Sequence, residues 1–106
     1  MSIKRIPKHL QNEGRKFWKS VLNEYEFEKT HDFELLAQAC ECLDRMQSCR
    51  DAITSDGLFQ KDRYGRAVEH DGLKVERAQK KLFLSIIREM GLSLDREQPQ
   101  KGRLYQ

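Results

Sequence analysis

The chain is 106 residues long, and 38% of these residues are hydrophobic while 35% are charged. This length predicts one small domain with a thin core, which oligomerisation would help to bury. No apolar run approaches the ~20 residues that a membrane-spanning helix requires, so we expect no membrane partner.

The net charge of +3 conceals a strong segregation of charge along the chain. Residues 1–20 carry six bases and one acid, residues 21–60 carry three bases and nine acids, and residues 61–106 carry eleven bases and seven acids. A basic N-terminal block indicates an anionic partner, most often nucleic acid. The same charge is also compatible with a solvated tail, and composition leaves both interpretations open.

The N-terminal quarter of the chain reads as an arm followed by a helix. Residues 1–9 form a basic arm that Pro7 is expected to keep extended. The bases of this arm are Lys4, Arg5 and Lys8. A first helix is predicted over about residues 10–25, where Gly14 on the apolar face indicates close packing against a neighbour. The opposite face presents three bases to solvent: Arg15, Lys16 and Lys19.

A long helix is predicted over about residues 31–55, and it has the most regular apolar stripe in the chain. The stripe repeats at alternating steps of four and three residues through Leu35, Ala39, Cys42, Met46, Cys49 and Ile53. This spacing is close to that of a coiled-coil seam, and it predicts antiparallel pairing with the last helix of the chain. The off-stripe acids are interpreted as a solvated face, and pairing with Arg45 and Arg50 is an alternative that the spacing leaves open: Glu41, Asp44 and Asp51.

The three cysteines, Cys40, Cys42 and Cys49, all fall within this long helix. An odd count in a chain without a signal peptide favours a reducing compartment. Helical spacing places Cys40 and Cys42 on different faces and no histidine lies nearby on the helix, so we expect no zinc site. The cysteines are therefore interpreted as small core residues.

Two short extended runs around a polar turn predict a β-hairpin over about residues 58–69. An isolated hairpin is marginally stable, so we expect it to rest on the helices or on another subunit. The tip combines three bases with one aromatic residue: Lys61, Arg63, Arg66 and Tyr64. Such a group can hold a phosphate backbone together with a sugar or base, although an ordinary charged turn has the same composition.

A third helix is predicted over about residues 71–90, and it should end at Gly91. Its expected core stripe is Val75, Ala78, Leu82 and Ile86, with Phe83, Ile87 and Met90 beside it. Surplus apolar surface on a second side predicts an interface with a second copy of the chain, formed by Leu73, Leu84 and Ile87. A helix well wrapped within a compact bundle explains the same surplus. Residues 10–92 are thus expected to form a single helical domain, and residues 93–106 a flexible tail.

No catalytic constellation is recognisable in the sequence. The three histidines, His9, His31 and His70, are scattered, and no phosphate-binding loop of the form GxxxxGK followed by Ser or Thr is present. We therefore expect no enzyme activity, no cofactor and no metal ion. The predicted fold class is mainly α, with three helices, a β-hairpin between the second and third, and a long antiparallel helical hairpin as the core.

Several short motifs follow one another along the chain in a recognisable order. They are Pro7-Lys8-His9-Leu10, Lys16-Phe17-Trp18, Thr30-His31-Asp32, Gly57-Leu58, Tyr64-Gly65, His70 with Leu73-Lys74, and Met90-Gly91-Leu92. Their order and spacing, from about Pro7 to Leu92, resemble the short helical family of bacteriophage terminase small subunits.

The sequence departs from the family at two points. Asp71 stands where the family usually has a proline, and it is expected to cap the helix instead. The segment after Gly91 is also shorter than in the family.

This resemblance implies a non-catalytic protein that assembles as a ring-shaped homo-oligomer in the cytoplasm of the bacterial host. Such a protein recognises double-stranded viral DNA and presents it to the terminase large subunit, which supplies the ATPase and nuclease. The expected contacts are to phosphates. The bases expected to make them are Lys4, Arg5, Lys8, Arg15, Lys16, Lys19, Lys61, Arg63 and Arg66.

Two other classes of protein are alternatives to this hypothesis. A helical protein-interaction or oligomerisation module would use the same apolar surfaces without binding DNA. A small helix-turn-helix regulator would need two short helices joined by three or four residues, and the long middle helix argues against it.

Overall fold

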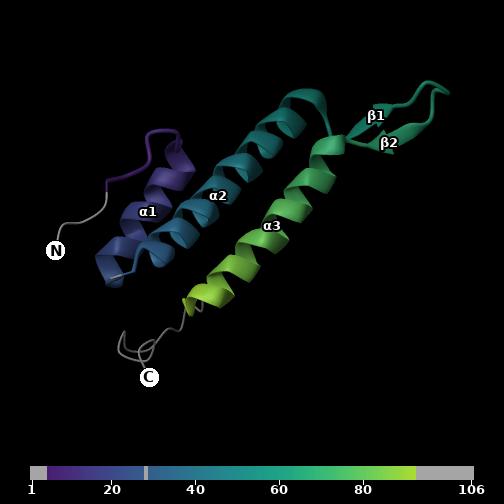
Figure 1. Ribbon diagram of the computed structural model, residues 1–106. Helices are drawn as coiled ribbons and strands as arrows, with labels where there is room; N and C mark the ends of the chain where they lie inside the picture. Colours follow the sequence, from purple (N-terminus) through teal and green to yellow (C-terminus); the bar gives the residue numbers. More distant parts are fainter. Residues whose placement is uncertain (1–4, 28, 93–106) are drawn as a thin grey trace.

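The computed structural model describes residues 5–27 and 29–92, and it confirms the mainly α fold (Figure 1). Three helices follow one another, and a two-stranded antiparallel hairpin lies between the second and the third. The elements are α1 (Asn12–Glu24), α2 (Thr30–Asp56), β1 (Phe59–Lys61), β2 (Ala67–Glu69) and α3 (Asp71–Met90). Each lies close to its predicted range.

The long antiparallel pair of α2 and α3 forms the centre of the fold, as the sequence predicted (Figure 1). The α2 stripe turns its buried side chains toward α3, where they meet the buried residues of that helix. The cluster consists of Leu35, Ala39, Cys42 and Met46 from α2 with Phe83, Ile86 and Ile87 from α3. The four-and-three spacing keeps these contacts in line along the seam.

Helix α1 packs on a different face of α2 and covers only its N-terminal half (Figure 1). The cluster at this contact joins Leu10, Trp18 and Val21 to Phe33, Leu36 and Cys40. Cys40 and Cys42 therefore belong to different clusters, which confirms that they lie on different helix faces. The edge-on contact of the Phe17 and Phe83 rings, 5.4 Å between centroids, joins α1 to α3.

A carboxylate from α2 caps the start of α1. Asp44 accepts hydrogen bonds from the backbone N–H groups of Gln11 and Gly14, each at 2.7 Å. The side chain of the N-cap residue Gln11 makes no capping hydrogen bond. Asp44 therefore supplies the acceptors that the N–H groups of the first turn would otherwise lack. Asp44 was interpreted from the sequence as part of a solvated face, and that interpretation is wrong.

His70 anchors the hairpin where α2 ends and α3 begins. Its Nδ1 accepts from the N–H of Gly72 at 2.8 Å, and its Nε2 donates to the Asp56 carboxylate at 3.0 Å. Its backbone N–H donates to the carbonyl of Leu58 at 2.7 Å. The sequence predicted Asp71 as the cap of α3, but Asp71 is the first helical residue and His70 is the cap. An imidazole nitrogen can accept a hydrogen bond as a carboxylate oxygen does, so His70 takes the capping role that was expected of Asp71.

The core face of α3 differs from the predicted stripe. Val75 and Leu82 were expected in the core, yet their exposed fractions are 47% and 46%. The N-terminal half of α3 instead turns Gly72, Glu76 and Gln79 inward, because the seam follows the row that leads to Phe83 and Ile87. An apolar flank of α3 is thereby left on the surface.

Replacement of Gly14 by alanine tests the close approach of α1 to α2. A Cβ at this position would lie 2.6 Å from Asp44 Oδ2 and 2.9 Å from the backbone carbonyl oxygen of Cys40. We expect Gly14→Ala to lower the free energy of unfolding by about 1–3 kcal/mol, because the helices must separate and the cap weakens. Denaturant unfolding followed by circular dichroism measures this change.

The control is Ser20→Ala on the exposed face of the same helix, which should change stability by no more than about 0.5 kcal/mol. Glycine normally costs a helix about 0.5–1 kcal/mol relative to alanine, so a stabilised Gly14→Ala protein would contradict the packing described.

Candidate nucleic-acid interface

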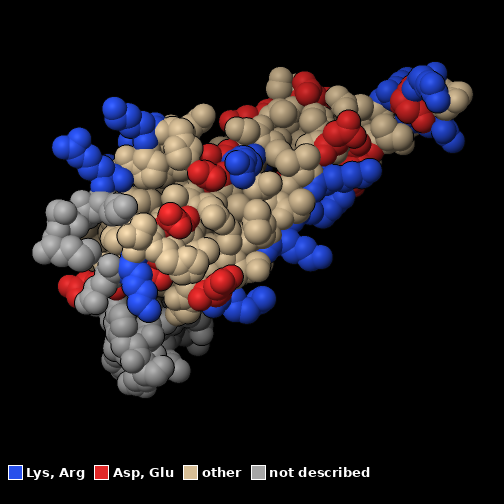
Figure 2. All heavy atoms as spheres, viewed as in Figure 1, with Lys and Arg blue, Asp and Glu red and all other residues tan. Residues whose placement is uncertain are grey.

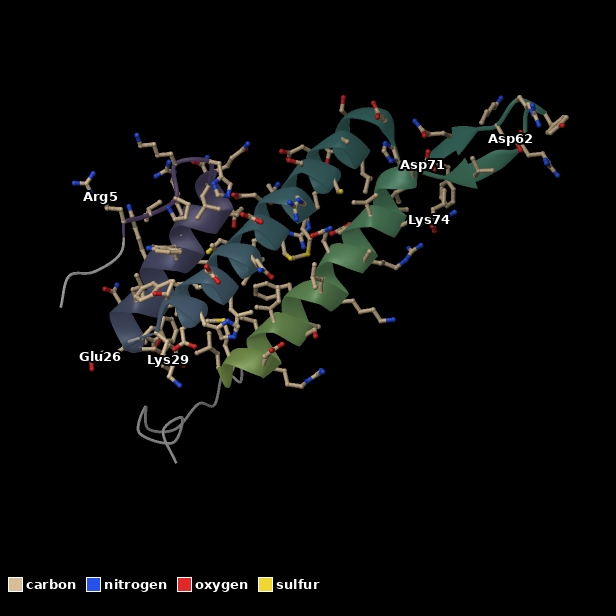
Figure 3. The ribbon with its side chains drawn as sticks, in the orientation of Figure 1. Arg5, Glu26, Lys29, Asp62, Asp71 and Lys74 are labelled. Atoms are coloured by element: carbon tan, nitrogen blue, oxygen red, sulfur yellow. The ribbon has the colours of Figure 1, made fainter. Side chains whose placement is uncertain are left out.

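The hairpin projects from the end of the helical pair and ends in a rigid basic tip (Figure 1). The Asp62 carboxylate organises the turn, since it accepts from the N–H groups of Tyr64 and Arg66 at 2.8 and 2.9 Å. Gly65 supplies the positive φ of 78° that the turn requires. These hydrogen bonds, chiefly that from Arg66, lower the pKa of Asp62 and keep it ionised. Figure 3 labels Asp62 at the far end of the hairpin.

The tip holds an exposed aromatic ring with two guanidinium groups close to it. Tyr64 is 68% exposed, and the guanidinium carbons of Arg63 and Arg66 each lie 5.2 Å from the centroid of its ring. Arg66 also donates to Asp62 at 3.2 Å, while Lys61 and Arg63 form no ion pair with any described residue. The three bases predicted at the tip therefore do lie together, and two of them retain uncompensated charge.

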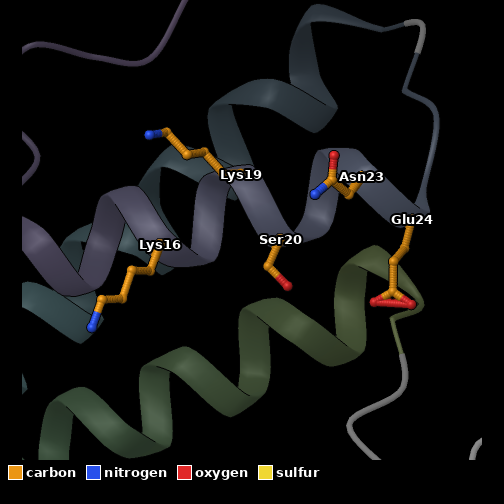
Figure 4. Close-up of a pocket in the computed structure, with 5 residues that line it drawn as sticks. All are labelled: Lys16, Lys19, Ser20, Asn23 and Glu24. Atoms are coloured by element: carbon orange, nitrogen blue, oxygen red, sulfur yellow. The ribbon is translucent and has the colours of Figure 1, made fainter.

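Two of the three predicted α1 bases lie on the outer side of that helix, beside a shallow hollow (Figure 4). The hollow is lined by Lys16, Lys19, Ser20, Asn23 and Glu24. Lys16 is paired loosely with Glu13 at 3.6 Å, and its side chain remains largely exposed. The hollow offers ammonium, hydroxyl and amide donors of the kinds that contact phosphate oxygens, beside the carboxylate of Glu24.

Arg15, the third predicted base of α1, is turned back toward the arm. Its Nε donates to the carbonyl of Leu10 at 2.8 Å, and a terminal nitrogen donates to that of Lys8 at 3.1 Å. Lys8 lies in a turn instead of the extended arm that was predicted, because Leu10 is buried against α1 and α2. Arg5 and Lys8 are exposed, whereas Lys4 lies outside the described residues.

The outer face of α3 carries a row of bases that was not predicted from the sequence. Five exposed bases share this face: Lys74, Arg77, Lys80, Lys81 and Arg88. Figure 2 shows them in blue along the edge of the helix, up to the foot of the hairpin. The repeat of seven residues from Lys74 to Lys81 to Arg88 predicts this basic face. It was overlooked because the helix was interpreted from its apolar positions alone.

The predicted oligomer residues lie in three different environments. Leu84 is exposed, Leu73 is half-buried, and Ile87 is only 4% exposed within the seam. Ile87 therefore stabilises the fold of the single chain, and its side chain is not available to a second copy. Further exposed apolar side chains occur on the hairpin and on one flank of α3: Leu58, Phe59, Val68, Val75 and Leu82.

The buried cysteines lack the character of nucleophiles. Burial raises the pKa of the Cys40 thiol from 9.0 to about 12, and it also raises the pKa of Cys42. Both thiols stay protonated at neutral pH, and the thiolate is the reactive form. Among residues 5–27 and 29–92, no cluster of His, Cys, Asp and Glu has the arrangement of a metal site. Within the same ranges, no helix is long and apolar enough to cross a membrane.

A family model described as phage terminase, small subunit, matches residues 14–103, which include α2, α3, the hairpin and all but the first two residues of α1. Comparison with curated proteins and with solved structures gives no match.

The raised pKa of Cys40 predicts a loss of stability in alkaline solution. The unfolded thiol ionises above pH 9.0 while the folded one remains protonated until about 12, so stability from this group declines as the pH rises through that interval. Urea unfolding at several pH values from neutral to alkaline should show the decline in the natural chain and a smaller one in Cys40→Ala.

The half-buried Cys49 provides the matched control. Cys49→Ala should retain the alkaline decline of the natural chain. Equal pH profiles for the natural chain and Cys40→Ala would show that this thiol does not contribute.

Proposed function

Because the chain belongs to the family of phage terminase small subunits, which serves phage DNA packaging, we propose that it recognises viral DNA and presents it to the large subunit. It performs no catalysis itself. It works as a ring-shaped homo-oligomer in the cytoplasm of the bacterial host. The observation that carries the proposal is the family match across the helices and hairpin, which the motif order in the sequence had predicted.

The rigid hairpin tip supports DNA binding on physical grounds. A turn fixed by Asp62 loses little conformational entropy on contact, so its charges are preorganised for phosphate. A two-stranded ribbon is narrow enough for the major groove of B-form DNA. Lys61 and Arg63 supply free charge, and Tyr64 supplies a ring that can stack on a sugar or base.

Further phosphate contacts come from the other end of the molecule. Lys16 and Lys19 at the hollow of α1, with Arg5 and Lys8 in the arm, are exposed and basic. Arg15 contributes by holding the arm against α1, since its guanidinium is occupied by two carbonyl groups. The two basic regions are separated along the molecule, so one duplex meets both most readily when several subunits stand side by side.

Self-association is supported by the apolar surface that the single chain leaves uncovered. The hairpin exposes Phe59 by 67%, and two-stranded hairpins gain stability when a further surface covers them. Val75 and Leu82 form a second apolar row on α3. We assign the contact between copies to Phe59, Val75 and Leu82. Leu73 and Leu84 fall by their helical spacing on the opposite side of α3, among its bases, and Ile87 lies in the core.

A protein-interaction module without DNA binding remains the second candidate, and the exposed apolar residues favour it equally. The two functions differ in their response to salt. Phosphate contacts release counterions, so DNA affinity falls steeply as salt rises, whereas apolar association does not.

Removal of two bases from the hairpin tip tests the proposed DNA contact. The variant Lys61→Gln with Arg63→Gln should bind a duplex of about 30 base pairs more weakly, by roughly 10-fold or more at low salt. The slope of log K against log salt should fall in magnitude by roughly 2, since each lost phosphate contact removes about 0.9. Fluorescence anisotropy of labelled duplex measures both quantities.

The matched control also removes one lysine and one arginine, by Lys29→Gln with Arg45→Gln. These residues are exposed and lie outside the proposed contacts. If the tip variant binds duplex as tightly as the natural chain does, the tip is not a DNA contact. If the natural chain shows no salt-dependent affinity for duplex, the proposed DNA-binding function is wrong.

A further inference from the structure

We propose that the outer face of α3 is a docking surface for duplex DNA, along which the bases of this helix contact successive phosphates. This inference rests on the proposed function and names a site for it that the motifs of the sequence did not indicate.

The bases of this face lie together because of their spacing. Lys74, Lys81 and Arg88 are each seven residues apart, which places them on one side of a helix, and Arg77 and Lys80 fall beside them. All five are exposed. Figure 3 shows Lys74 on α3, near the foot of the hairpin.

The acids of α3 lie away from this face. Glu76 turns inward and accepts a hydrogen bond from Arg50 of α2 at 2.7 Å. Asp71 and Glu89 fall by their helical spacing on the flank that carries Leu82. The basic face therefore contains no carboxylate of its own helix.

Most of this positive charge is uncompensated. Among the residues that the structure describes, Lys74, Lys80, Lys81 and Arg88 form no ion pair. Arg77 is the exception, since it binds Glu69 at 2.7 Å and thereby lowers the pKa of that carboxyl group. Unpaired bases that lie close together on a surface repel one another. A polyanion that covers this face would therefore stabilise the folded chain.

Three of the six acids of α2 are bound within the chain. Glu41 binds His9 at 2.7 Å, Asp44 caps α1, and Asp56 binds His70. These three carboxylates are not free to complement the basic face of a second copy. Duplex DNA carries a regular, dense row of exposed phosphates, so it complements the α3 face better than another subunit does.

The dimensions of the face suit a duplex. At 1.5 Å per residue, the row from Lys74 to Arg88 is about 21 Å long. Double-stranded DNA carries one charge per about 1.7 Å of its axis, so about a dozen phosphates lie within this length. The hairpin continues beyond α3, and its basic tip lies further along the molecule (Figure 2). A duplex on α3 can therefore also reach the tip.

The test uses the full chain and the variant Lys81→Gln with Arg88→Gln. Glutamine has nearly the helix propensity of these bases, so the fold should be retained, and thermal unfolding by circular dichroism checks this. We expect duplex affinity to fall on the order of 10- to 100-fold at low salt, and the salt slope to fall by roughly 2. The control pair Lys29→Gln with Arg45→Gln, which removes the same charge, should bind as the natural chain does.

Four results would overturn the inference. Natural affinity in the α3 variant would show that DNA does not lie there, and the proposed function would survive if the natural chain still binds duplex. An equal loss in the control pair would show that only net charge matters. A changed subunit number in native mass spectrometry of the α3 variant would identify the face as a contact between copies. Failure of the natural chain to bind duplex would overturn both proposals together.

Discussion

Helix α2 has to be buried on two sides, and the rest of the structure depends on this constraint. Its Cys42 face packs against α3 and its Cys40 face packs against α1, so two thin clusters take the place of one central core. A chain with so few apolar residues can bury these two faces of α2 but little further surface. The hairpin and one flank of α3 are left exposed as a consequence, and they are the surfaces that a second copy can cover.

The same constraint divides the charged residues between architecture and binding. The Asp44 carboxylate joins α1 to α2, and Asp56 joins the end of α2 to His70 at the root of the hairpin. These acids hold elements together, so they no longer balance the bases on the far surfaces. Positive charge remains free on the outer face of α3, at the hairpin tip and on α1 (Figure 2). Because the chain belongs to a family that serves phage DNA packaging, we propose that this charge contacts phosphate.

Much of the fold could be predicted from the sequence, because the strongest signals are local. The stripe from Leu35 to Ile53 fixed the long helix within a residue or two, and the turn residues near Gly65 fixed the hairpin. The prediction that Val75 and Leu82 lie in the core was wrong for a physical reason. These two residues fit the helical period as well as the residues of the actual core face do. The roles of Asp44 and His70 could not be predicted, because each joins segments that only the folded chain brings together. Of the candidate site, the tip was found from composition, whereas the α3 bases were hidden among apolar neighbours and Arg15 was taken for a free charge.

Native mass spectrometry of the full chain, with and without a duplex of about 30 base pairs, tests the central claim most directly. The account predicts a defined assembly of many subunits that gains the mass of a duplex when DNA is added. A monomer whose mass is the same with and without duplex would contradict both the apolar contact between copies and the role of the free bases.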